Sequence, residues 1–109
     1  MNTLPPIVQR YIDAENAHDP EALAACFAPD GTVEDDGETL VGNAAILGWA
    51  RHIVTAYQLT SVVNKVLVRG ETTELEVTIS GTFDGSPLDF RQTFQVRDGL
   101  IAAYRTELL

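Results

Sequence analysis

The fold class is decided by one stretch, Glu74-Leu75-Glu76-Val77-Thr78-Ile79-Ser80-Gly81-Thr82-Phe83, in which polar and apolar residues alternate. A period of two is typical of a strand with one face on a core and the other in water. On either side of this stretch we expect further strands near 59–69, 87–97 and 100–108, joined at Arg69-Gly70-Glu71, Asp84-Gly85 and Asp98-Gly99. The second half therefore predicts a four-stranded antiparallel meander.

The first half has the spacing of helices instead. Pro5 and Pro6 suit the start of a first helix, and Asp19-Pro20 suits the start of a second that runs through Phe27. After Gly42, one apolar stripe predicts a third helix with Ile46, Trp49, Ala50, Ile53 and Tyr57 on one face. A short strand follows Gly31. Helices first and strands afterwards predict an α+β fold, with three N-terminal helices packed on a curved antiparallel sheet.

Length and charge limit the classes of function. The 109 residues make a single domain, 1–109, and 16 acidic against 7 basic side chains give a net charge of −9. Nucleic acids and anionic membranes both require a basic surface, so we expect neither as a partner. Neither a membrane span nor a signal peptide is evident, which favours a soluble cytoplasmic protein. Cys26, His18 and His52 are too dispersed for a structural zinc site.

Several polar residues fall on faces that the periodicity places inside the protein. Gln92 interrupts the apolar face of strand 87–97, Asn64 is in line with valines of strand 59–69, and Asp35 shares a strand face with Val33. Tyr11 lies on the buried face of the first helix. Each has a structural alternative: Asp35 can cap a turn, Tyr11 can be a core aromatic, and the amides can bond to backbone.

Taken together, these groups suit one chemistry. A carboxylate, a phenol and an amide around an apolar cavity provide a base and two hydrogen-bond donors. Such a set can remove a proton next to a carbonyl and hold the enolate oxygen. The residues expected to form the substrate pocket are Trp49, Asn64, Phe83, Phe90, Phe94, Tyr104 and Thr106.

Four segments carry a resemblance to a known family: Ile7-Val8-Gln9-Arg10-Tyr11, Asn16-Ala17-His18-Asp19, Phe27-Ala28-Pro29-Asp30-Gly31-Thr32-Val33-Glu34-Asp35 and Gly42-Asn43-Ala44-Ala45-Ile46. The sequence resembles the delta-5-3-ketosteroid isomerases, within the nuclear-transport-factor-2-like superfamily that includes the SnoaL-like polyketide cyclases. The resemblance implies a cone-shaped α+β fold. It also implies that Tyr11 is an oxyanion donor and Asp35 the general base. Gln92 stands where the family has a protonated aspartic acid.

The resemblance implies an enzyme that needs no cofactor, acting on a small apolar molecule with a carbonyl group, such as a steroid or polyketide. It also implies a homodimer formed through the outer face of the sheet. Two alternatives stay open: a domain of the same fold that binds a ligand or dimerises without catalysis, and a polyketide cyclase that uses the carboxylate for an aldol ring closure.

Overall fold

The structure is a computed structural model that describes residues 3–109. Met1 and Asn2, which begin the N-terminal segment where no signal peptide is expected, lie outside the described residues. It contains three helices and six strands, and the expected α+β class is confirmed. In chain order the elements are α1 (Pro6–Asn16), α2 (Pro20–Ala24), β1 (Phe27–Asp35), β2 (Glu38–Val41), α3 (Asn43–Tyr57), β3 (Thr60–Arg69), β4 (Thr72–Ser80), β5 (Leu88–Arg97) and β6 (Leu100–Leu108).

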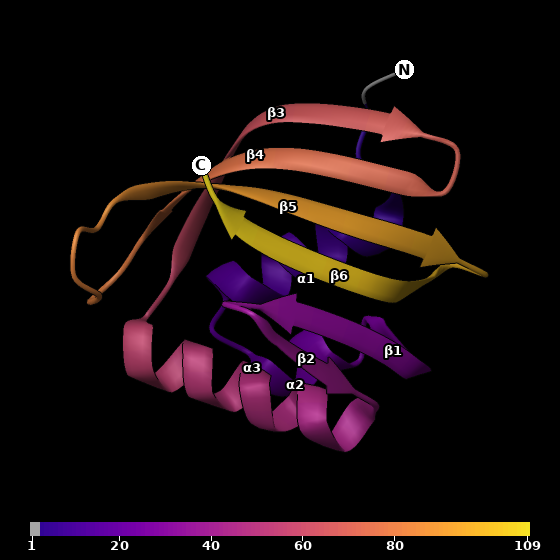
Figure 1. The fold of residues 1–109 in the computed structure, drawn as a ribbon, viewed down its shortest axis with the longest axis horizontal. Helices are drawn as coiled ribbons and strands as arrows, with labels where there is room; N and C mark the ends of the chain where they lie inside the picture. Colours follow the sequence, from indigo (N-terminus) through magenta and orange to yellow (C-terminus); the bar gives the residue numbers. More distant parts are fainter. Residues whose placement is uncertain (1–2) are drawn as a thin grey trace.

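All six strands form one curved sheet in the order β2-β1-β6-β5-β4-β3 (Figure 1). The predicted meander of β3 to β6 is confirmed, and each of its neighbouring pairs is antiparallel. The expectation of a fully antiparallel sheet is wrong at one pair, because β1 runs parallel to β6. The antiparallel strand β2 was not predicted. The parallel pairing joins the helical half of the chain to the meander and brings Asp35 beside Thr106.

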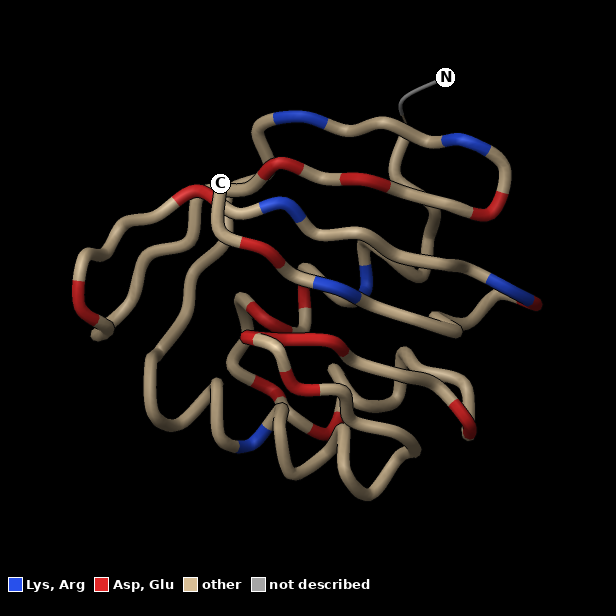
Figure 2. Tube along the Cα trace, viewed as in Figure 1, with Lys and Arg blue, Asp and Glu red and all other residues tan. Residues whose placement is uncertain are grey.

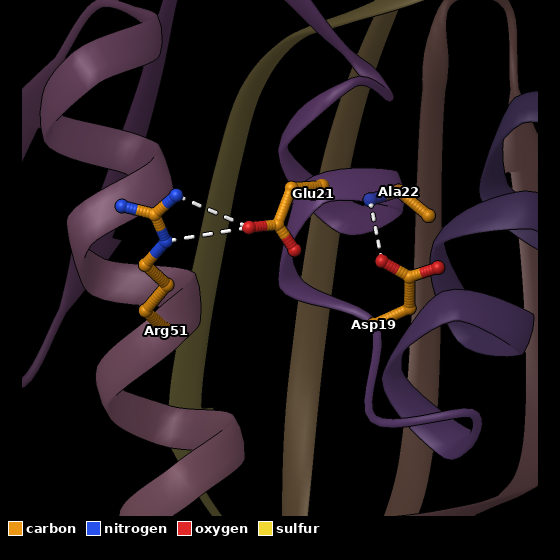
Figure 3. Close-up of polar contacts among 4 residues, drawn as sticks. All are labelled: Asp19, Glu21, Ala22 and Arg51. Carbon is orange, nitrogen blue, oxygen red and sulfur yellow. Dashed lines mark hydrogen bonds and ion pairs between the residues drawn. The ribbon is translucent and has the colours of Figure 1, made fainter.

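The helix starts predicted from the prolines are confirmed. Pro6 and Pro20 each occupy the first turn of a helix, where a missing N–H leaves no bond unmade. Asp19 caps α2 by accepting a hydrogen bond from the Ala22 N–H at 3.1 Å, and Arg51 of α3 pairs with Glu21 of α2 (Figure 3). The second helix is shorter than predicted, ending at Ala24, because Phe27 already belongs to β1.

The helices cover the concave face of the sheet (Figure 1). α1 lies behind the sheet and contacts β3 and β6, while α3 packs against β1, β2 and α2. The predicted alternation of β4 is confirmed, because Leu75, Val77 and Ile79 are buried in the core beneath these helices.

The connection between β4 and β5 is longer than the predicted tight turn. β4 ends at Ser80, and Gly81 and Phe83 lie in the loop that follows. A side chain on Gly81 would collide with the Tyr57 carbonyl oxygen, which accepts a hydrogen bond from the Thr82 N–H at 2.7 Å. Contact with the end of α3 therefore replaces the strand pairing that the alternating sequence favours.

The convex face of the sheet is polar. In Figure 2, acidic segments of β1 lie beside β6, and acidic segments of β4 lie beside β5, and both of these neighbouring strands carry basic residues. Ion pairs join Arg105 to Glu34 at 3.9 Å and Arg91 to Glu74 at 3.3 Å. In residues 3–109, the helices are too short or too polar to cross a membrane.

Candidate functional site

A cavity of about 680 Å³ lies between the helices and the concave face of the sheet. Its volume is within the range of small-molecule sites. Its wall includes residues from α1, α3, β1, β5 and β6, and from the loop that holds Phe83. The cavity therefore joins segments that are far apart in the sequence.

Strand register places three polar side chains in one row across the cavity wall. Asp35 of β1 is paired with Thr106 of β6, which is paired with Gln92 of β5. Side chains directly opposite each other on neighbouring strands share one face of the sheet. With strands about 4.8 Å apart, Asp35 and Gln92 are about 10 Å from each other at the backbone, which leaves room for a flat molecule between them.

Asp35 ends β1 at the cavity and is half-buried. The indole N–H of Trp49, on α3, donates a hydrogen bond of 3.0 Å to Asp35 Oδ2. Within residues 3–109, the other oxygen, Oδ1, has no hydrogen-bond donor. One oxygen is thus oriented by the protein and the other is free to accept a proton.

Tyr11 lies on the buried face of α1, with no exposed surface. Burial, together with the charges of Tyr104, Glu15 and Asp35, raises the pKa of Tyr11 well above 10, so its hydroxyl keeps its proton. The rings of Tyr11 and Tyr104 are 5.0 Å apart and the nearby Tyr104 hydroxyl contributes to the raised pKa of Tyr11, but the two hydroxyls fall short of hydrogen-bond geometry, and Tyr11 Oη has no partner among residues 3–109. Tyr11 is therefore a hydrogen-bond donor without an acceptor.

Gln92 is fully buried, and neither its amide nitrogen nor its amide oxygen has a partner in the described chain. A buried polar group without a partner costs about 1–3 kcal/mol. Gln92, with this unfavourable free energy, lies on the wall of the cavity beside Thr106. An unpartnered amide at this position is suited to bind a polar group of a ligand.

Glu15 is a cavity residue that was not predicted as part of the site. It is one helical turn beyond Tyr11 on α1 and is 2% exposed. Burial raises the pKa of Glu15 from 4.5 to about 7, although a hydrogen bond from Ser61 opposes the change. The signal was its position four residues after Tyr11, on the face predicted to be buried.

The structure brings together most of the residues expected in the pocket. The cavity wall includes Trp49, Phe83, Phe90, Tyr104 and Thr106 from that set. Phe94 packs in the core instead, with its ring 5.2 Å from Tyr11 and 5.0 Å from Tyr104. Phe94 lies one step further along the inward face of β5 than Gln92, where the helices close on the sheet.

The expected place of Asn64 in the pocket is incorrect. Asn64 is exposed and donates a hydrogen bond of 2.7 Å to the hydroxyl of Thr78. The reason is a bulge in β3 between Val63 and Lys65, which shifts the register against β4. Residues on either side of the bulge no longer follow one alternation, so Val62 is also exposed.

Comparison of the sequence with models of known protein families identifies the family of this chain. The model of the SnoaL-like domain matches residues 8–104, and the chain belongs to this family. The resemblance stated from the sequence is thereby confirmed. None of the curated proteins matches this chain.

Solved structures with the same fold include a candidate polyketide cyclase, a candidate ketosteroid isomerase and a protein with a ketosteroid isomerase-like fold. A candidate polyketide cyclase, SMa1630 of Sinorhizobium meliloti, is 36% identical, with a TM-score of 0.91 and 95% of each chain covered. A protein of Catenulispora acidiphila with a ketosteroid isomerase-like fold, bound to trimethylamine, is 25% identical, with a TM-score of 0.86 over 96% of this chain and 86% of that chain. A candidate ketosteroid isomerase of Kribbella flavida shares the fold at 21% identity and a TM-score of 0.82, over 96% and 76% of the two chains.

Proposed function

We propose that this protein removes a proton next to a carbonyl group of a small, largely apolar molecule, steroid-like or polyketide-like. The observation that carries the proposal is the set of polar groups at one cavity: a free carboxylate oxygen on Asp35 and two buried donors, Tyr11 and Gln92, without protein partners. Buried polar groups without partners lower the stability of the folded protein, so folding alone does not account for them. A bound carbonyl oxygen would satisfy both donors.

In the proposed reaction, Asp35 Oδ1 accepts the proton from the carbon next to the carbonyl. The electron pair of that C–H bond moves onto the carbonyl oxygen, which becomes an enolate. The Tyr11 hydroxyl and the Gln92 amide N–H donate hydrogen bonds to this oxygen. Trp49 holds the other oxygen of Asp35, so the base keeps its orientation. The substrate carbonyl itself takes up the charge, and the proposed step therefore uses no cofactor.

Aromatic residues around the polar groups favour an apolar substrate. Trp49, Phe83, Phe90 and Tyr104 line the cavity, and rings of this kind bind flat apolar molecules. The 36% identity with a candidate polyketide cyclase supports a polyketide-like substrate.

The test is the exchange of α-protons of soluble ketones with D2O, followed by proton NMR. We expect Asp35→Asn to lower the enzymatic exchange rate by about 10²–10⁴-fold, because the general base is lost. Asp30→Asn is the matched control: it removes the same charge from an exposed position of β1 outside the cavity. If the purified protein gives no exchange above background, or if Asp35→Asn exchanges at the normal rate, the proposal is wrong. Ligand binding without exchange would favour the non-catalytic domain.

A further inference from the structure

The cavity wall carries acidic groups that no basic side chain balances. Glu15 and Asp35 belong to the wall, and the exposed Asp36 follows them at the rim, directly after β1. Among residues 3–109, Arg105 is the one basic residue of the wall, and its guanidinium group pairs with glutamates of β1 and β6 on the convex face of the sheet. A cleft lined by charge of one sign attracts ligands of the opposite sign.

Glu15 is the buried member of this set, and the fold leaves it incompletely bonded. It is 2% exposed, and the Ser61 hydroxyl bonds to its Oε1 atom. Within residues 3–109, no hydrogen bond reaches Oε2 and no ion pair includes Glu15. The joint between α1 and β3 does not require Glu15, because the Asn16 side chain bonds to both the N–H and the carbonyl oxygen of Ser61. A purely structural role therefore does not explain Glu15.

Aromatic rings lie beside the same acidic groups. The ring centre of Tyr104 is 5.0 Å from that of Tyr11 and 5.8 Å from that of Trp49. Burial raises the pKa of Tyr104, and the charges of Glu15 and Asp35 raise it further, so both carboxyl groups lie near this ring. The faces of aromatic rings attract cations, and organic ammonium ions are recognised by such rings.

We infer that the cavity selects a molecule with a tertiary or quaternary ammonium group, so that the substrate of the proposed reaction carries a positive charge in addition to its carbonyl group. The inference rests on the proposed function only in treating this molecule as the substrate. An organic ammonium ion presents C–H groups to the rings and its charge to the carboxyl groups. The net charge of −9 also favours the approach of a cation.

The charge would also assist the proposed reaction. Glu15 lies one helical turn beyond Tyr11 on α1, and the Tyr11 hydroxyl is the proposed donor to the enolate oxygen. An ammonium group held beside Glu15 therefore lies close to the oxygen on which negative charge develops. It stabilises that charge in the transition state, and no bond to the ammonium group forms or breaks.

Binding of a cation should be linked to the ionisation of Glu15. The groups that face Glu15 are the Ser61 hydroxyl from β3, the Tyr11 phenol from α1 and the Tyr104 phenol from β6, with Asp35 of β1 beyond them. Burial raises the pKa of Glu15 to about 7, so a fraction of the molecules holds this proton near neutral pH. A bound cation favours the ionised form. Binding should therefore release protons and become tighter as the pH rises through about 7.

The experiment compares two ketones of the same shape, phenacyltrimethylammonium and 3,3-dimethyl-1-phenyl-1-butanone, which differ in having a quaternary nitrogen or a quaternary carbon. In calorimetric titrations at pH 8, we expect the cation to bind the unmodified protein at least about tenfold more tightly. Glu15→Gln should weaken binding of the cation by about tenfold and change that of the neutral ketone by less than about twofold. Glu71→Gln removes an exposed glutamate between β3 and β4, so it is the matched control for net charge and should change neither.

A second titration counts the protons released. Measured at pH 7 in buffers of different ionisation enthalpy, binding of the cation to the unmodified protein should release protons. We expect no release with the neutral ketone or with Glu15→Gln. The absence of release from the unmodified protein would contradict the placement of the ammonium group beside Glu15.

The outcomes separate this inference from the proposed function. Equal affinities for the two ketones would overturn the inference, and this comparison uses the unmodified protein, so it does not depend on the folding of a variant. Exchange of the α-protons of the neutral ketone that depends on Asp35 would then still support the proposed function. Preferential binding of the cation with no such exchange of either ketone would instead overturn the proposed function and support the ammonium site.

Discussion

Polar side chains on the two faces of the sheet are in opposite situations. On the convex face most are exposed and paired, as in the hydrogen bonds that Thr78 makes with Asn64 and Asp89. Arg91 Nε is buried there without a hydrogen-bond partner, but it lies 3.3 Å from Glu74 in an ion pair. On the concave face they are few and buried, and Tyr11 and Gln92 have no partner in the described chain. Exposed pairs contribute about 0–1 kcal/mol each, whereas a buried unpartnered group costs about 1–3 kcal/mol. The site is therefore indicated by the concave face, where buried polar groups lack partners, and not by the convex face, where most are paired.

The largest effect on stability should come from the apolar end of the concave face. Phe94→Ala removes a fully buried ring that packs on Tyr11 and Tyr104. We expect it to lower the free energy of unfolding by about 3–5 kcal/mol, measured by urea denaturation. Phe90→Ala, at the cavity wall, should cost clearly less because its ring is only partly buried. If both variants lowered the free energy of unfolding equally, Phe94 would not be more tightly packed than Phe90, and the prediction would be wrong.

Glu15 should make stability depend on pH. Its pKa is raised from 4.5 to about 7 on folding, so the folded state binds the proton more tightly and stability falls as the pH rises through this window. The shift corresponds to a loss of about 3 kcal/mol between pH 4.5 and pH 8. Thermal or urea unfolding of Glu15→Gln across this range should show a flatter profile than the unmodified protein. Profiles of the same slope would show that Glu15 titrates normally.

Gln92 should affect stability and activity in opposite directions. Gln92→Leu replaces two unpartnered polar atoms with an apolar group of similar size, and we expect a gain of about 1–3 kcal/mol in urea unfolding. Loss of the proposed oxyanion donor should lower α-proton exchange by about 10²–10³-fold. A destabilised variant would indicate that the amide has partners in solution.

The smallest effect should come from the convex face. Glu74→Gln breaks an exposed ion pair in which both side chains are 40% accessible. We expect a change of no more than about 1 kcal/mol, decreasing further when salt is added. A cost comparable to that of Phe94→Ala would contradict the comparison of the two faces.

Local patterns predicted the parts of the fold that depend on neighbours in the sequence. The alternation of β4 and the proline starts of α1 and α2 are such parts, because side-chain direction and backbone donors are properties of a few adjacent residues. The end of α2, the bulge at Asn64 and the loop at Gly81 depend on contacts with distant segments. Periodicity carries no information about such contacts, and the predictions there were incorrect.

Sequence alone predicts the α+β class, the family resemblance and the inward positions of Tyr11, Asp35 and Gln92, because strand and helix periods fix which residues share a face. Which of these residues meet depends on how the folded segments pack. The parallel pairing of β1 with β6 sets Asp35 in one row with Thr106 and Gln92, and the crossing of α1 over the sheet brings Glu15 to the same cavity. The physical reason is that distances between segments are fixed by the packing of the whole chain, which no local pattern contains.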